Sequence, residues 1–319
     1  MKSAPAPEAA ASELAGADVR ALEARFGRAP GVHFEMRYGG PVAVLSACGS
    51  TAVVALQGAQ VLSWRAAGQS DDTLWLSPQA QLGTGKAVRG GIPVCWPWFG
   101  AHLVDAAKPA HGFVRAAPWR VTGSATSATR ARLVLSFDTA GIATDLWAPR
   151  ANVEIEFTVG ETLMIALSTD NLSAQPFDVT QALHTYLAVG DIGGVAISGL
   201  DGRTYIDQLD LAAQGVQSGA IRIEREVDRI YQATPDDVVV SDLSLGREIR
   251  VAKSGSLSTV IWNPWIEKAA RLGDMGDEGY RRMVCVETAN AGRDVVTLAA
   301  RARHRLVTEI SVRSLMAKA

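Results

Sequence analysis

The chain has 319 residues, of which 48% are hydrophobic and 20% are charged, and its 31 Lys and Arg nearly balance its 33 Asp and Glu. A chain this long and this apolar can bury a large core, which excludes a disordered tail and a small disulfide-stapled protein. The net charge of −2 offers no bulk attraction to nucleic acid or to an anionic membrane. We therefore expect neither as a partner.

The three cysteines, Cys48, Cys95 and Cys285, are widely spaced and odd in number. This spacing predicts neither a disulfide framework nor a zinc site, and it favours the reducing cytoplasm. The N-terminus lacks the basic and then apolar pattern of a signal peptide. The uncharged stretch 42–64 is interrupted by Ser, Thr, Gln and Gly, so we interpret it as two strands and a turn rather than a membrane span.

The N-terminal region is predicted to be separate from the rest of the chain. Residues 1–11 are rich in Ala and Pro, which predicts disorder. Apolar residues recur at helical spacing over 15–26, which predicts a helix, and Asp18 can cap it. We expect a flexible segment and a helix in 1–30, followed by a single domain over 31–319.

From residue 32 onward the dominant pattern is an alternation with a period of two. The clearest case is 153–167, where Val, Ile and Phe alternate with Glu and Thr on both sides of a Gly-Glu turn. This predicts a hairpin with one buried face. Similar alternation occurs at 133–137, 221–223, 238–251 and 306–312. Turn-rich clusters roughly 8 to 15 residues apart favour an all-β antiparallel sandwich over a βαβ sheet.

Four segments depart from this pattern, and the first is R-G-G-I-P-V-C-W-P-W-F-G at 89–100. Paired glycines after Arg89 let the backbone approach a ligand closely, while the two prolines stiffen the rest of the segment. The alternative is a loop with a surface arginine and a Trp-rich plug of the core. The segment is not a phosphate-binding P-loop, because the GK[ST] ending is absent.

The second segment is H-G-F-V-R at 111–115. In an extended chain, His111 and Arg115 would point to the same face. An arginine fork donates two parallel hydrogen bonds to phosphate, so Arg89 and Arg115 can clamp a phosphate monoester. The alternative is that each arginine pairs with a surface carboxylate.

The third segment is F-D-V-T-Q-A-L-H-T-Y-L at 177–187. Its apolar residues mark one face, and His184 falls on the other face with Asp178 and Thr180. Histidine can give or take a proton near pH 7. A structural role for a lone histidine stays open.

The fourth segment combines W-N-P-W at 262–265 with D-M-G-D-E at 274–278 and M-V-C-V-E-T at 283–288. Glu287 shares a strand face with Cys285 and Met283. Such apolar neighbours raise the pKa of a carboxyl toward the range of a general base. The alternative is a Glu at the end of a strand that pairs with an arginine such as Arg282.

Together with E-V-D-R-I-Y at 226–231, these motifs resemble, in order, those of the hexose-6-phosphate mutarotases. These enzymes are glucose-6-phosphate 1-epimerases, a branch of the aldose 1-epimerase superfamily. The resemblance covers about residues 31–315. It implies a large antiparallel β-supersandwich of the galactose mutarotase-like type.

The resemblance also implies site residues. The catalytic pair falls on His184 and Glu287. The residues implied to contact the substrate are Arg89, His111, Arg115 and Asp228. Two departures bear on the pocket: Ala110 stands where relatives often have Gln, and Thr288-Ala289-Asn290 follow the catalytic Glu.

Anomer exchange needs a base and an acid on opposite sides of C1, and no cofactor or metal is expected. We expect Glu287 to act as the base and protonated His184 as the acid, with the roles reversed on ring closure. Some of the tryptophans near these motifs can place an aromatic face against the sugar. The candidates are Trp96, Trp98, Trp262 and Trp265.

Two other functions remain open. One is an epimerase for free aldoses or for another sugar phosphate. The other is a sugar-phosphate-binding β-sandwich without catalysis. A glycosidase is disfavoured, because no second carboxylate has a comparable motif. We expect a monomer whose partner is a small hexose phosphate.

Overall fold

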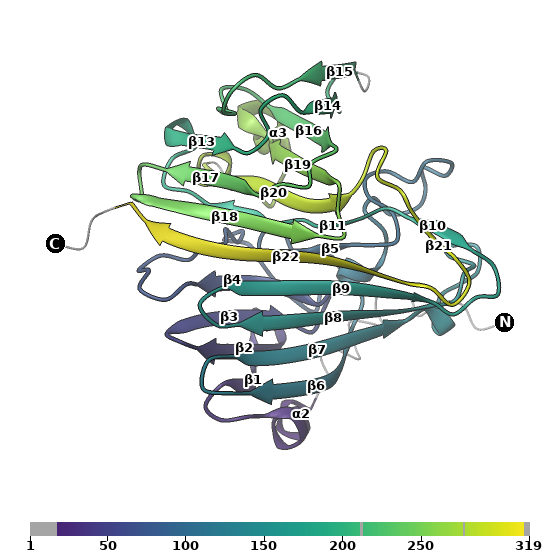
Figure 1. Ribbon diagram of the computed structural model, residues 1–319. Helices are drawn as coiled ribbons and strands as arrows, with labels where there is room; N and C mark the ends of the chain where they lie inside the picture. The colour runs from purple at the N-terminus through teal and green to yellow at the C-terminus, as the bar shows by residue number, and fades with distance from the viewer. Residues whose placement is uncertain (1–17, 211–212, 277, 316–319) are drawn as a thin grey trace.

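The computed structural model describes residues 18–210, 213–276 and 278–315, and most of its regular structure is β-sheet (Figure 1). Every pair of named strands runs antiparallel. The predicted all-β antiparallel fold is confirmed. Among the described residues, no helix is both long and apolar enough to cross a membrane.

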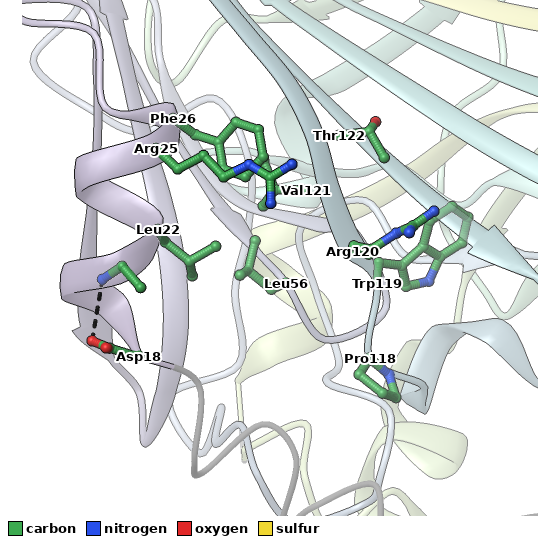
Figure 2. A pocket seen from close by; sticks show the side chains of 11 residues that line it. Asp18, Leu22, Arg25, Phe26, Leu56, Pro118, Trp119, Arg120, Val121 and Thr122 are labelled. Atoms are coloured by element: carbon green, nitrogen blue, oxygen red, sulfur yellow. Dashed lines mark hydrogen bonds between the residues drawn. The ribbon is translucent and has the colours of Figure 1, made fainter.

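The predicted N-terminal helix is present as α2 (Val19–Phe26), and Asp18 caps it by accepting from two backbone N–H groups. A groove of about 710 Å³ separates the helix from the strand that begins at Arg120, and Figure 2 shows Leu22 and Leu56 facing into it. None of the predicted site residues lines this groove. The disorder predicted for 1–11 lies outside the described residues.

Three sheets build the body of the molecule. The first has four strands in chain order: β1 (Val32–Arg37), β2 (Gly40–Ala47), β3 (Ser50–Ala55) and β4 (Gln60–Arg65). The stretch 42–64 therefore spans parts of three strands, where we expected two, because a second turn at Cys48 and Gly49 has positive φ. Figure 1 shows this sheet behind the lower strands of the second one.

The second sheet has eight strands in the order β13-β17-β18-β22-β9-β8-β7-β6. In this order they are Val195–Ser198, Val238–Asp242, Arg247–Ser254, Arg303–Ser314, Leu163–Asn171, Ala151–Val159, Ala131–Asp138 and Arg120–Thr126. The predicted hairpin is β8 and β9, which close with Val159 opposite Leu163. The stretch 221–223 is not a strand, since Ile221 forms only an isolated bridge to Ile197.

The third sheet follows the order β15-β14-β16-β19-β20-β11-β5, and β12 also pairs with β20. In this order, with β12 last, they are Ala213–Val216, Thr204–Asp207, Val227–Gln232, Ser258–Asn263, Met283–Asn290, Gln181–Leu183, Val94–Cys95 and Tyr186–Ala188. The remaining elements are α3 (Trp265–Arg271), the paired strands β10 (Phe177–Val179) and β21 (Val296–Leu298), and four short 3₁₀-helices, η1 (Val114–Ala116), η2 (Thr139–Gly141), η3 (Ile192–Gly194) and η4 (Gly279–Arg282).

One large core joins the sheets, and it uses only one face of the third sheet. Tyr231, Ile261 and Val286 of β16, β19 and β20 all belong to this core. A hydrogen bond from Thr288 Oγ1 to Thr308 Oγ1, 3.0 Å long, ties β20 to β22 inside it. Because side chains alternate along a strand, the opposite face of the third sheet carries every second residue of these strands.

Candidate active site

The face of the third sheet that turns away from the main core carries most of the predicted site. Asp228 is paired across the strands with Trp262, Trp262 with Cys285, and Cys285 with Tyr186. The next row on the same face runs from Ile230 through Val260 to Glu287. Strand alternation thus brings Asp228 and Glu287 to one surface, although they lie far apart in the sequence.

His184 lies in the gap between β11 and β12, directly across from Glu287. Leu183 is opposite Thr288 and Tyr186 is opposite Cys285, so the same register continues through the gap. The backbone there is held by Val286, whose N–H donates to Thr185 O. We expected Asp178 to share a face with His184. Asp178 instead lies on β10, where it accepts a hydrogen bond from Thr297 Oγ1.

The catalytic pair predicted from the motifs is in contact. Nε2 of His184 lies 3.3 Å from Oε1 of Glu287, and the Glu287 side chain is 1% exposed. Neither carboxylate oxygen has a hydrogen-bond partner that meets standard geometry within the described residues. The alternative pairing with Arg282 does not occur, because that guanidinium donates to Gly190 O. A buried, unpartnered carboxylate is costly for stability, which is typical of a group kept for chemistry.

Burial moves the pKa values of the two groups toward each other. Burial first, and then the charge of Asp228, raises the pKa of Glu287 well above its usual value. Burial first, and then the nearby His111 and Arg115, lowers the pKa of His184 well below its usual value. The expected raised pKa of Glu287 is confirmed in direction. Before substrate binds, the imidazole of His184 is therefore neutral at pH 7, whereas we expected its protonated form.

Three neighbours hold the imidazole ring of His184. Tyr186 stacks on its face with ring centroids 4.8 Å apart and an angle of 13° between the planes. Trp262 meets it edge-on at 6.1 Å. Sγ of Cys285 lies 3.7 Å from Nδ1. These contacts fix the orientation of the ring before substrate arrives.

His111 also faces the site, but not by the extended backbone we expected. Its φ is +62°, and Gly112, at φ +74°, packs so closely on Trp96 that a Cβ would lie 1.8 Å from the carbonyl oxygen. The ring centroids of His111 and His184 are 5.6 Å apart. Gly100 N–H donates to Nδ1 of His111, which leaves Nε2 as the donor. Burial, with help from the two site arginines, lowers the pKa of His111 to about 3.

Arg89 and Arg115 both lower the pKa values of His111 and His184. Nε of Arg89 lies 2.6 Å from Oδ1 of Asp274, so the carboxylate pairing left open for this residue does occur. Burial opposes the charge of Arg89, but Tyr186 and Asp274 outweigh it and the pKa is raised. Arg115 is the middle residue of η1 and donates to Ala110 O at 2.9 Å, and its charge lowers the pKa of both site histidines.

Asp228 lies at the opposite end of its cross-strand row from Tyr186. Burial, opposed by the charge of Lys268, raises the pKa of Asp228 to about 6. Lys268 Nζ on α3 lies 4.0 Å from Oδ2 of Asp228 and 2.9 Å from Oε1 of Glu226. Asp228 is therefore ionised at neutral pH and can accept a hydrogen bond from a sugar hydroxyl.

An apolar groove of about 740 Å³ begins where the Glu287 row ends. Ile206 and Ile230 of that row line it, and so does Phe99, whose ring lies 5.0 Å from that of His111. None of the predicted site residues lines this groove.

Of the three residues that orient His184, sequence reasoning named Trp262 as a candidate site residue and gave no orienting role to Tyr186 or Cys285. Tyr186 and Cys285 were part of quoted motifs without a role, and the alternation in H-T-Y and M-V-C-V-E was the signal that placed them beside the pair. Of the candidate aromatic residues, Trp262 lies at the site, whereas Trp96 is buried in the main core and donates to Thr169.

One group of side chains could ligate a metal ion within the described residues: atoms of His184, Cys285 and Glu287 lie within 4.8 Å of one another. Cys285 and Glu287 approach opposite edges of the imidazole, at Nδ1 and Nε2. A single ion can use only one of these nitrogens. The arrangement fits a chain of hydrogen bonds through the ring better than a shared ion.

Comparison with known proteins gives the class of this site. The family model described as Aldose 1-epimerase matches residues 41–311. A relative in Escherichia coli (strain K12), named "Putative glucose-6-phosphate 1-epimerase", is 39% identical over 238 residues, which are 74% of this chain and 79% of the relative. A relative of the same name in Cenchrus ciliaris is 33% identical over 75% of this chain and 74% of its own length.

Solved structures agree. A structure described as a putative mutarotase from Salmonella typhimurium has a TM-score of 0.82 and 33% identity, with 89% of this chain and 94% of that chain covered. A galactose mutarotase-like protein from Clostridium acetobutylicum, at 14% identity, shares the fold with a TM-score of 0.70 over 89% and 98% of the two chains.

The chain is thus a sugar epimerase, an isomerase that interconverts anomers. It belongs to the aldose 1-epimerase family.

Proposed function

We propose that this enzyme interconverts the α and β anomers of a hexose 6-phosphate, with glucose 6-phosphate as the first candidate. The observation that carries the proposal is the buried contact of 3.3 Å between His184 Nε2 and Glu287 Oε1. We expected the base and the acid on opposite sides of C1, but the two groups lie side by side. The two oxygens on C1 of a sugar are themselves neighbours, so adjacent acid and base groups can serve both at once.

In the forward direction Glu287 takes the proton of the anomeric hydroxyl and His184 gives a proton to the ring oxygen. The C1–O5 bond breaks, the aldehyde forms, and rotation about C1–C2 presents its other face. The ring then closes as His184 takes back its proton from the C5 hydroxyl and Glu287 gives its proton to the C1 oxygen. The raised pKa of Glu287 and the lowered pKa of His184 bring the two groups closer in proton affinity, which suits a reaction that runs both ways.

The phosphate is assigned to Arg89 and Arg115, with His111 Nε2–H as a further donor to the substrate. Both arginines lower the pKa of His184 before substrate binds. A bound dianion would neutralise them, and it would raise the pKa of His184 toward the range in which the ring can carry the proton it gives to O5. Asp228 would accept from a sugar hydroxyl. The names of the relatives, which specify glucose 6-phosphate, support the choice of substrate.

A free aldose is the second candidate. The observation in its favour is the Arg89–Asp274 ion pair, which already satisfies part of the guanidinium. The proposal also includes a monomeric, cytoplasmic protein. The free state of Cys48, Cys95 and Cys285 supports the cytoplasm.

Exchange spectroscopy by NMR tests the proposal. Anomer exchange is measured for glucose 6-phosphate, glucose and galactose, each with and without enzyme. The proposal expects the largest acceleration for glucose 6-phosphate. Faster exchange of a free sugar would select the second candidate. Binding of glucose 6-phosphate without any acceleration would reject catalysis and select a binding protein.

A further inference from the structure

The two edges of the His184 ring face different residues. Nε2 lies 3.3 Å from Oε1 of Glu287, and Nδ1 lies 3.7 Å from Sγ of Cys285. Tyr186 covers the flat face of the ring and so does not compete for either nitrogen. Among the described side chains, Cys285 is the hydrogen-bond partner of Nδ1, and the backbone of His184 itself is a second partner of the ring. The sheet places it there, because Cys285 is opposite Tyr186 and diagonal to His184.

We propose that the Cys285 thiol donates to Nδ1 of His184 and thereby holds the imidazole in the tautomer that carries hydrogen on Nε2. Cys285 is then a positioning residue for the proposed reaction, and this inference rests on that function. A neutral imidazole has one donor and one acceptor nitrogen, so fixing one fixes the other. The donors then all point in one direction, with the Cys285 S–H directed at Nδ1 and the His184 Nε2–H directed at Glu287.

The opposite chain would disable the base. If Nδ1–H donated to the sulfur, Nε2 would be an acceptor facing Glu287, and Glu287 would have to carry a proton to bond to it. In the chain we favour, Nε2–H faces the Glu287 carboxylate at 3.3 Å, a contact that lies outside standard hydrogen-bond geometry before substrate binds, and the favourable partner for this N–H is the ionised carboxylate that the base requires. Its second oxygen stays free for the anomeric hydroxyl of the substrate. Burial raises the pKa of the Cys285 thiol, so the donor proton stays on the sulfur.

The test reads the tautomer directly. The full chain is labelled with ¹⁵N-histidine, and the ring nitrogens of His184 are assigned by comparison with His184→Asn. The wild-type spectrum, recorded without substrate at pH 7 to 8, is expected to show hydrogen on Nε2 and none on Nδ1. Hydrogen on Nδ1 would overturn the inference without any variant being needed.

Two variants extend the test. Cys285→Ser keeps a donor and is expected to keep the tautomer and most of kcat. Cys285→Ala removes the donor, and it is expected to shift the tautomer toward Nδ1–H. We expect kcat to fall about 10- to 100-fold with KM unchanged, as when the group that orients a histidine is lost. The matched control is Cys95→Ala, the other buried cysteine of this sheet, which has no hydrogen bond to His184 in the described structure.

A fall in kcat for Cys285→Ala with an unchanged tautomer would overturn the inference, because packing alone would then explain the loss. The proposed function fails separately: if glucose 6-phosphate exchange is not accelerated by the wild type, the reaction assignment is wrong whatever the tautomer shows.

Discussion

Strands β8 and β20 both combine alternating apolar residues with glutamate, but these glutamates have different surroundings in the structure. In β8, Phe157 and its buried neighbours alternate with half-buried glutamates, and Glu156 pairs with Arg132 at the surface. In β20 the same alternation ends at Glu287, but both faces are buried and no arginine pairs with it. A glutamate on a supporting strand gains a partner and water, whereas the glutamate of the site is deprived of both. The difference marks where the fold gives up stability for chemistry.

The largest effect expected is from Glu287→Gln. Loss of the base should lower kcat for glucose 6-phosphate by about 10² to 10⁴ with little change in KM. Stability should not fall, because a buried charge without a hydrogen-bond partner is removed. Exchange spectroscopy and thermal unfolding measure the two quantities. The same change at Glu156 is the matched control and should alter neither by much, since exposed ion pairs contribute about 0 to 1 kcal/mol. Fast exchange in Glu287→Gln would remove Glu287 from the mechanism.

Phe157→Ala should have the opposite outcome to Glu287→Gln: it should lower stability and leave the rate unchanged. Its ring is fully buried in the main core, so truncation should cost about 3 to 5 kcal/mol of unfolding free energy. The rate per folded molecule should stay at the wild-type value, because β8 lies in a different sheet from the site. Chemical denaturation and exchange rates corrected for the folded fraction measure this. A loss of rate beyond the loss of folded protein would mean that the two sheets are coupled more tightly than their separate roles imply.

Arg89→Ala tests the phosphate assignment. Loss of charge-assisted hydrogen bonds of roughly 1.5 to 3 kcal/mol should raise KM for glucose 6-phosphate about 10- to 100-fold. Any rate with free glucose should change far less, so the same variant carries its own control. Arg132→Ala, on the second sheet, should leave both unchanged. An equal loss for both sugars would instead assign Arg89 to holding Asp274 and Tyr186 in place.

Asp228→Asn should have a smaller effect, which depends on pH. The pKa of Asp228 is about 6 in the folded protein against an ordinary 3.8, so the folded chain keeps this proton to higher pH than the unfolded chain does. Its contribution to stability therefore falls as pH rises from about 3.8 to about 6 and stays low above that. The pKa difference corresponds to at most about 3 kcal/mol. Because Asp228 is partly exposed and the variant also loses its contact with Lys268, we expect a gain of about 1 to 2 kcal/mol at pH 7.5 that vanishes near pH 4. Unfolding curves at both pH values measure it, and a gain that is larger at pH 4 would reverse the assigned sign.

Local patterns predicted what depends on neighbours in the sequence. Asp18 and the helical spacing after it placed α2, and the Gly-Glu turn placed the β8–β9 hairpin. The shared face of Cys285 and Glu287 followed from alternation, and the proposed catalytic pair followed from the resemblance to a family.

What depends on long-range pairing was beyond the sequence. The bond between Arg89 and Asp274 joins segments 185 residues apart, and that between Cys285 and His184 joins segments 101 apart. The expected extended run at His111 was wrong because the close packing of Gly112 on Trp96 imposes a turn.

The tight glycines have a consequence for where this scaffold tolerates substitution. A Cβ at Gly91 would lie 2.0 Å from Val61 O, and one at Gly112 would lie 1.8 Å from Trp96 O, so neither position tolerates a side chain. Gly100, at the other end of the loop before His111, has nothing within 4 Å of such an atom, and Leu103 is fully exposed. Substitutions in the loop that follows Gly100 therefore meet less steric resistance than substitutions at Gly91 or Gly112.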